Sequence, residues 1–345
     1  MKLYEITIKP VSGFGTPLKG DTLFGHFCWQ AAYDDKILKG GLDKWMACYL
    51  DRPFAVFSTA WPKLCENGKM FYAVKRPDIP LARIFSETYK DKRKSMEARK
   101  ANARKKWMLI PDDLRISLSI DRFKSDEDIL KIIEKEATNV TRKNMHGKPR
   151  KKFLEDFIQS HNTINRETST TGTGMFAPYV QTATFYYPEM LLAVFVLVDE
   201  EATDIERILT ALARIGQFGY GRDASTGCGR FEMGEIKSRE IPNIGDADAC
   251  YTLAPAIPEK NIFQQCYFSP FTRFGRHGDV LARSSNPFKN PVIMIDEGAV
   301  LIPNDIHTIK TPYIGRPALN VSKVIPQAVI QGYTPWLPFK METQT

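Results

Sequence analysis

The chain has 345 residues, of which 43% are hydrophobic, 11% aromatic and 26% charged, and its formal net charge at pH 7 is +8. This composition supplies ample apolar material and excludes a wholly disordered chain, while the length exceeds what one core usually serves, so we expect two domains. The longest apolar run, residues 190–198, is about half of what a membrane helix needs, so no membrane partner is expected.

The first residues predict a strand followed by a helix. Residues 2–10 alternate apolar and polar side chains, which is typical of a strand and not of a signal peptide. A helix is predicted over 21–38, with Asp21 as its N-cap. The stretch 49–180 has poor periodicity and many turn formers, which indicates a large insertion, and within it only 86–107 and 126–137 are predicted helices.

The positive charge is concentrated in that insertion. Residues 90–106 contain nine Lys and Arg against two acidic residues, and residues 142–152 contain six basic residues and no acidic one. Clustered cations gain affinity for a polyanion by releasing counterions from its phosphates, so these segments indicate RNA contact. The alternative is that they are solvated helix faces.

Regular elements resume at residue 190. Residues 190–198 predict a strand buried on both faces, and 204–215 predict a helix that begins with a capping box of Thr203 and Glu206. A glycine-rich loop at 216–230 and a strand at 230–238 follow. The order of strand, helix, insertion, strand, helix and strand indicates an α+β, ferredoxin-like domain over 1–240. From 241 to 345, short strand-like runs separated by Pro and Gly predict a β-rich second domain.

The glycine-rich loop is the strongest local signal. It contains GQFGYG, but it follows a helix and precedes a strand, the reverse of a dinucleotide fingerprint. Glycines let backbone N–H groups approach a ligand, and Arg and hydroxyl side chains suit phosphates. The residues predicted to contact RNA are Gly219, Tyr220, Gly221, Arg222, Ser225, Thr226, Gly227 and Arg230. The alternative is a loop that only packs against the helix.

A second polar cluster lies at 161–176, where a Thr- and Gly-rich run follows HNTINR. Asn and Arg can pair with base edges or phosphates, so His161, Asn162, Asn165 and Arg166 are predicted RNA contacts. The alternative is a disordered surface loop.

No catalytic or metal site is expected. The five histidines, at 26, 146, 161, 277 and 307, are scattered singly, and the six cysteines form no CxxC pair. The cysteines are typical of reduced thiols in a cytoplasmic protein. We therefore predict no cofactor, no metal and no enzymatic activity.

Three of these stretches resemble the RAMP proteins of CRISPR systems: KGDTLFGHFCW after the first strand, the HNTINR segment, and GYGRDASTGCGRFEM. The C-terminal YIGRPALNVSKVIPQAVIQGYTPWLPF is similar to the tail of the Csm-type subunit that caps the 5′ end of the guide RNA in type III-A effector complexes. The resemblance covers roughly 1–35, 160–235 and 310–340 and leaves the basic insertion unmatched. Cys228 stands where family members often carry a bulky apolar residue.

The resemblance implies tandem ferredoxin-like (RRM-like) domains and a non-catalytic subunit that binds the single-stranded 5′ handle of the guide RNA. It also implies two protein partners, a large polymerase-like CRISPR subunit and a backbone RAMP subunit. Lys19 and Asp21 would lie at the strand-to-helix turn, and Lys19 is a further predicted RNA contact.

Two alternatives remain open at this point. One is a metal-independent RAMP endoribonuclease that processes CRISPR repeat RNA, with His26 or His161 as general base. The other is a structural scaffold without RNA contact of its own.

Overall fold

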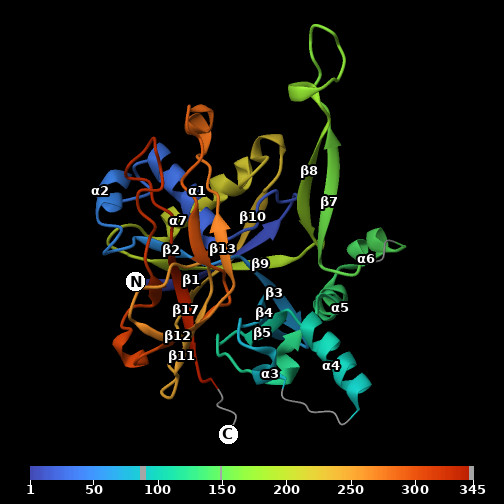
Figure 1. The fold of residues 1–345 in the computed structure, drawn as a ribbon, viewed down its shortest axis with the longest axis vertical. Helices are drawn as coiled ribbons and strands as arrows, with labels where there is room; N and C mark the ends of the chain where they lie inside the picture. Colours follow the sequence, from blue (N-terminus) through green and yellow to red (C-terminus); the bar gives the residue numbers. More distant parts are fainter. Residues whose placement is uncertain (86–90, 148–149, 342–345) are drawn as a thin grey trace.

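The computed structural model describes residues 1–85, 91–147 and 150–341. The chain contains both helices and strands, so the mixed α and β class predicted from the sequence is confirmed (Figure 1). Within the described ranges, no helix is long and apolar enough to cross a membrane.

An eight-stranded antiparallel sheet forms the centre of the molecule. Its strands follow the order β10-β1-β9-β3-β4-β5-β6, and β2 also pairs with β9. Their bounds are β1 (Lys2–Pro10), β2 (Ala55–Phe57), β3 (Trp61–Glu66), β4 (Lys69–Lys75), β5 (Trp107–Pro111), β6 (Phe123–Lys124), β9 (Leu191–Val198) and β10 (Phe231–Arg239). β1 lies between β9 and β10, where Ile6 pairs with both Val194 and Ile236.

Two helices, α1 (Gly20–Tyr33) and α7 (Ile205–Phe218), contact each other and pack beside these strands, α1 against β2 and α7 against β10. The apolar stripe of α7 buries Ile208, Leu212 and Ile215, and burying each such side chain contributes roughly 1.5–3 kcal/mol. β1, α1, β9, α7 and β10 occur in the order predicted for residues 1–240, and β3, which was not predicted, adds a strand between α1 and β9.

Both predicted helix caps are wrong. Asp21 lies inside α1, buried, and its carboxylate accepts two hydrogen bonds from Arg273 at 2.6 and 2.9 Å. α7 is capped by Asp204, which accepts from the Arg207 N–H at 3.0 Å, while the Thr203 hydroxyl donates instead to the Ile37 carbonyl. Tertiary partners far away in the chain therefore outcompete the local capping pattern.

The stretch 49–180 is more than an insertion, because β3 to β6 continue the main sheet and bury Tyr72 and Val74 completely. Its other elements are β7 (Leu154–His161), β8 (Tyr179–Tyr186), α3 (Leu81–Ile84), α4 (Lys92–Arg104), α5 (Asp126–Glu136), α6 (Asn139–Met145) and two 3₁₀ turns (Ile120–Arg122 and Gly174–Phe176). The short helix α2 (Leu42–Ala47) precedes this stretch. The helix predicted at 126–137 is confirmed as α5, and the one predicted at 86–107 is shorter, with residues 86–90 outside the described ranges.

The strands β7 and β8 form a two-stranded hairpin that projects from the body (Figure 1). They pair in unbroken register from Leu154 opposite Tyr186 to His161 opposite Tyr179. At its base the hairpin joins the body through Phe14, whose N–H and carbonyl both bond to Thr184 at 2.9 Å.

Residues 241–341 form a second, five-stranded antiparallel sheet with the order β12-β15-β11-β17-β16 and a separate pair, β13 with β14. The bounds are β11 (Ala249–Thr252), β12 (Phe263–Tyr267), β13 (Pro270–Arg273), β14 (Val292–Ile295), β15 (Val300–Pro303), β16 (Tyr313–Gly315) and β17 (Tyr333–Phe339). The helical turns described in this region are 3₁₀ only, Asp279–Arg283 and Ile306–Thr308. The region is β-rich as predicted, and the tandem ferredoxin-like arrangement stays a prediction.

The two regions share one hydrophobic core. The largest buried cluster contains Leu253, Leu337 and Phe339 together with the apolar residues of the main sheet. The buried Gln331 side chain bonds both backbone groups of Phe57, accepting from its N–H at 3.0 Å and donating to its carbonyl at 2.8 Å. A domain boundary near 241 stays a prediction, and the two regions pack as one body.

Candidate nucleic-acid interface

The glycine-rich loop is held in shape by glycines that no other residue could replace without strain. Gly219, with φ of 106°, ends α7, and a Cβ there would lie 2.5 Å from the Cys228 carbonyl oxygen. A Cβ on Gly229 would lie 2.1 Å from the Tyr220 carbonyl oxygen. Gly227 differs, because its φ is 99° but a Cβ would meet nothing within 4 Å. Gly219 and Gly229 thus close the loop, and Gly227 faces open space.

His26 of α1 fastens this loop to the body. The Gly221 N–H donates to His26 Nε2 at 2.9 Å, and the His26 ring lies 4.8 Å from the ring of Tyr220. Burial lowers the pKa of His26 to about 4, so the imidazole is neutral at pH 7 and Nε2 serves as an acceptor. The Tyr220 ring is fully buried and its hydroxyl donates to the Pro17 carbonyl at 2.9 Å, so its side chain is a packing residue.

The outer part of the loop is exposed and polar. Ser225, Thr226 and Arg230 are exposed, and within the described residues Arg230 makes no ion pair. The guanidinium of Arg222 already has two partners within the protein. It donates to the Thr182 carbonyl at 2.5 Å and lies 3.1 Å from the Asp223 carboxylate. The exposed part of the loop therefore presents the hydroxyls of Ser225 and Thr226, the glycine backbone, and the guanidinium of Arg230, which has no acidic partner among the described residues.

The N-terminal loop 11–17 supports this surface, which the sequence analysis missed. The Thr16 hydroxyl accepts from the Arg222 N–H at 2.9 Å, and the Ser12 hydroxyl accepts from the Arg230 N–H at 2.8 Å. A signal was present, because SGFGTP carries two glycines and two hydroxyl residues directly after the first strand.

The second predicted segment forms the outer end of the hairpin. His161 stacks on Tyr179 with ring centroids 5.5 Å apart, and beyond this pair Asn162 and Arg166 are exposed. Asn165 is used in the turn, where its side-chain oxygen accepts from the Glu167 N–H at 2.9 Å.

The structure joins the glycine-rich loop to the hairpin, but not to its tip. Gln181 of β8 donates to the Asp223 carboxylate at 3.0 Å, next to the Arg222–Thr182 contact. Among the described residues, no hydrogen bond or ion pair joins 161–166 to 216–230. The glycine-rich loop therefore lies against β8 at Gln181 and Thr182, and the segment 161–166 lies further out on the same hairpin.

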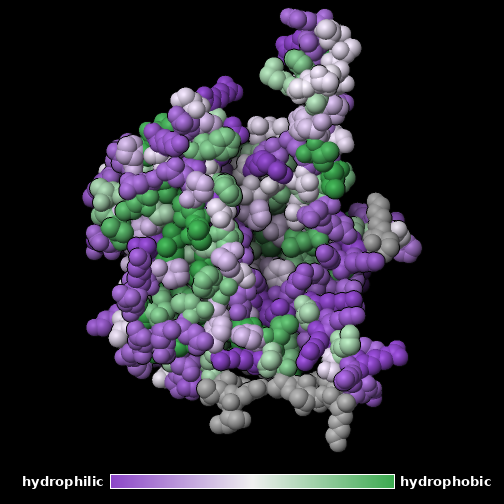
Figure 2. Space-filling view, in the orientation of Figure 1, coloured by the Kyte–Doolittle hydropathy of each residue, from purple (hydrophilic) through white to green (hydrophobic). Residues whose placement is uncertain are grey.

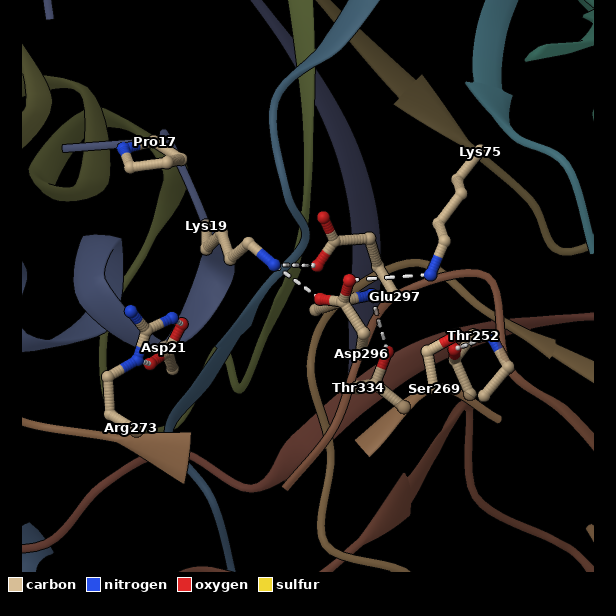
Figure 3. A network of polar contacts seen from close by, with 12 residues as sticks. Pro17, Lys19, Asp21, Lys75, Thr252, Ser269, Arg273, Asp296, Glu297 and Thr334 are labelled. Atoms are coloured by element: carbon tan, nitrogen blue, oxygen red, sulfur yellow. Dashed lines mark hydrogen bonds and ion pairs between the residues drawn. The ribbon is translucent and has the colours of Figure 1, made fainter. Parts of the chain in front are cut away.

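Lys19 has a structural role instead (Figure 3). Its ammonium group pairs with Asp296 and lies 3.1 Å from the Glu297 carboxylate, and only 17% of the side chain is exposed. Lys75 also reaches Asp296, at 3.3 Å. The charge of Lys19 is thus neutralised at the junction of the two regions, so the geometry does not favour the RNA contact predicted for it. Its partners lie 277 residues further on, where sequence reasoning could not find them.

The two basic segments of the insertion differ in how many of their cations are paired within the protein. No residue of α4 is buried, and among the described residues its one ion pair joins Arg93 to Glu97 at 3.1 Å. In the second segment, Arg142 donates to the Lys135 carbonyl and Arg150 pairs with Glu155 at 3.1 Å. Lys90 and Lys148 lie outside the described residues. Most of the available positive charge therefore lies on α4.

The structure offers no grouping of His, Cys, Asp and Glu that could hold a metal ion in its described part. All six cysteines are free thiols.

Comparison with known proteins gives the class of the fold. No protein-family model and no curated protein sequence matches the chain. Solved structures do match: a "Csm1-Csm4 cassette in complex with cA4" (13% identity, TM-score 0.57, covering 99% of this chain and 100% of that one) and the same cassette with pppApA (13%, TM-score 0.53, 99% and 98%). A "Csm3-Csm4 subcomplex in the type III-A CRISPR-Cas interference complex" matches at 14% identity and a TM-score of 0.51, covering 99% of this chain and 100% of that one.

The likeness to RAMP proteins of type III CRISPR systems, inferred from three sequence stretches and the C-terminal tail, is therefore confirmed at the level of the fold. The component shared by these structures is Csm4, and the chain is Csm4-like in fold over nearly its whole length.

Proposed function

We propose that this chain is a non-catalytic RNA-binding subunit of a type III, Csm-like CRISPR effector complex. In this proposal it anchors the single-stranded 5′ handle of the guide RNA and bridges the large polymerase-like subunit and the backbone RAMP subunits. The observation that carries the proposal is the coincidence of a Csm4-like fold with a glycine-rich loop whose outer part presents the exposed Ser225, Thr226 and Arg230 beside the glycine backbone.

The physical support for RNA binding lies in how this surface is built. A phosphate can approach the backbone at Gly227, where no Cβ intervenes, and can pair with Arg230, which has no acidic partner among the described residues. The hairpin beside it presents the stacked His161 and Tyr179, and aromatic faces stack on unpaired bases. The surface therefore suits a single strand better than a duplex.

The geometry also disfavours catalysis by His26. A general base needs a free lone pair directed at the 2′-hydroxyl, whereas His26 Nε2 already accepts from the Gly221 N–H and the ring is buried.

One observation favours the alternative, a metal-independent endoribonuclease: Tyr179 lies against His161, and such a pair could serve as base and acid. Purified protein incubated with repeat-containing RNA, with EDTA and separately with Mg²⁺ or Mn²⁺, decides between the two. We expect intact RNA throughout. Discrete products that vanish in both His161→Ala and Tyr179→Phe would establish the endoribonuclease instead.

Binding is tested by fluorescence anisotropy with a labelled single-stranded RNA that carries the repeat-derived 5′ handle. We expect Arg230→Ala and Thr226→Val to weaken binding, by roughly 1.5–3 kcal/mol for the charged contact. Arg115→Ala removes an equally exposed arginine outside both segments and serves as the control. Equal affinity of all three variants and the wild type would refute the placement of the RNA on this loop.

A further inference from the structure

An apolar hollow lies where residues 316–319 pass the strand β14. Its volume is about 460 Å³, and its lining is mainly aliphatic: Leu50, Ile257, Val292, Ile293, Arg316, Pro317, Ala318 and Leu319. Ile293 is 75% exposed, Leu50 48% and Leu319 46%. Figure 2 shows apolar side chains gathered on the left half of the face in view, whereas the lower right is mostly hydrophilic. Large apolar side chains exposed together usually mark a contact with another molecule.

The backbone of β14 is open at the same place. Ile295 exchanges hydrogen bonds with Ala256 at 2.9 and 3.0 Å, on the edge of β14 that faces away from β13. Because backbone groups alternate with a period of two, the N–H and C=O of Ile293 point toward this edge as well. No described residue bonds to them there. The backbone of Ile293 is therefore unpaired on this edge among the described residues, at a residue that lines the hollow.

The hollow has one charge. Arg316 is exposed, and among the described residues its side chain makes neither a hydrogen bond nor an ion pair. Its backbone N–H is fixed by the Ile257 carbonyl at 3.0 Å, so the residue cannot move far from the rim. A partner carboxylate would find a positioned guanidinium beside an apolar cavity.

We propose that this hollow is a docking site for a protein partner that inserts one bulky apolar side chain, with a carboxylate beside it for Arg316. We assign the large polymerase-like subunit as this partner, and this assignment rests on the proposed function. A 460 Å³ hollow with an aliphatic wall matches the anchor pockets in which protein interfaces concentrate their binding energy. RNA is disfavoured as the occupant, because its affinity depends on several phosphate contacts and the lining holds a single cation.

The choice of partner follows from where the charges lie. The hairpin and α4, where the guide would continue, lie on the right of Figure 1, and the strands of the second region lie on the left. Backbone subunits that hold the continuing guide would approach from the right. The apolar left side then remains for the large subunit.

The test uses the full chain and two purified subunits from the same CRISPR system, the large polymerase-like subunit and the backbone subunit, each titrated separately by biolayer interferometry. Ile293→Glu and Leu319→Glu each place a charge on the wall of the hollow, and both sites are exposed enough for the fold to persist. Val140→Glu, on α6, is the matched control, because Val140 is 68% exposed and lies outside the hollow. Affinity for the 5′-handle RNA is measured in parallel for every variant.

We expect both hollow variants to lose about tenfold or more in affinity for the large subunit, with RNA binding and backbone-subunit binding unchanged. Arg316→Glu should weaken the same interaction. Loss of affinity for the backbone subunit alone, loss of RNA affinity, or no loss at all would each overturn the assignment. If the wild-type protein binds neither subunit while still binding RNA, the bridging part of the proposed function fails, and the docking proposal fails with it.

Discussion

The contact between His26 and the glycine-rich loop gives a prediction about acid stability. In the folded chain the pKa of His26 is lowered to about 4 by burial, against 6.5 for an exposed imidazole. Above pH 6.5 the side chain is neutral in both folded and unfolded states and adds no pH dependence. Between pH 6.5 and 4 the unfolded chain binds a proton that the folded chain does not, so the free energy of unfolding falls as the pH falls.

The size of this effect follows from the two pKa values. The 2.5-unit difference corresponds to about 3 kcal/mol once the pH is below 4, and to about 1.4 kcal/mol at pH 5.5. His26→Gln removes the titration and keeps an acceptor for the Gly221 N–H. We therefore expect this variant to lose less stability than the wild type between pH 7.5 and 5.5, by about 1.4 kcal/mol.

The assay is urea-induced unfolding at pH 7.5 and 5.5, followed by circular dichroism, with the exposed His307→Gln as control. His26→Ala should lower the free energy of unfolding at both pH values by about 1–3 kcal/mol, because it leaves the Gly221 N–H without its acceptor. An identical loss of stability in the wild type and in His26→Gln would refute the reasoning. So would a proton NMR titration that gives His26 an ordinary pKa.

Three other predictions concern charge and backbone. Replacing the basic residues of α4 by Gln should reduce the slope of log affinity against log salt by roughly 0.7 per lost phosphate contact; a slope equal to that of the wild type would mean that α4 does not contact RNA. Lys19→Met should lower stability by about 3 kcal/mol, since it leaves the buried Glu297 carboxylate without its cation while Asp296 keeps Lys75; a variant as stable as the wild type but deficient in RNA binding would restore Lys19 as an RNA contact. Gly229→Ala should disrupt the loop through its clash with Tyr220, whereas Gly227→Ala should cost only about 1 kcal/mol of backbone strain; equal melting temperatures for the two would contradict this distinction.

Much of the first region was predictable because its signals are local. The alternation of residues 2–10 and the apolar run at 190–198 gave β1 and β9 to within a residue, and the stripe of α7 identified its buried face. Charge counts likewise pointed to α4, which has no buried residue.

What failed depended on partners distant in the chain. Residues 61–64 of β3 and 72–74 of β4 are buried. Their short, irregular sequence pattern is typical of a loop, and they form strands because they pair with β9 and β5. Asp21 was predicted as a helix cap from its position before an apolar run. Its actual partner, Arg273, is 252 residues away and could not be identified from the local sequence. Gly219 and Gly221 looked alike in sequence, yet one ends a helix and the other anchors His26.

The position of β1 has a consequence for biosynthesis. The first strand of the chain lies between β9 and β10, so one of its hydrogen-bonding edges has no partner until residue 198 has been translated and the other has none until residue 239. Pairings this distant carry a large loop-closure cost and fold slowly. For most of translation the nascent chain therefore exposes an apolar strand, which makes it a client for chaperones at the ribosome and places its folding after the synthesis of the entire first region.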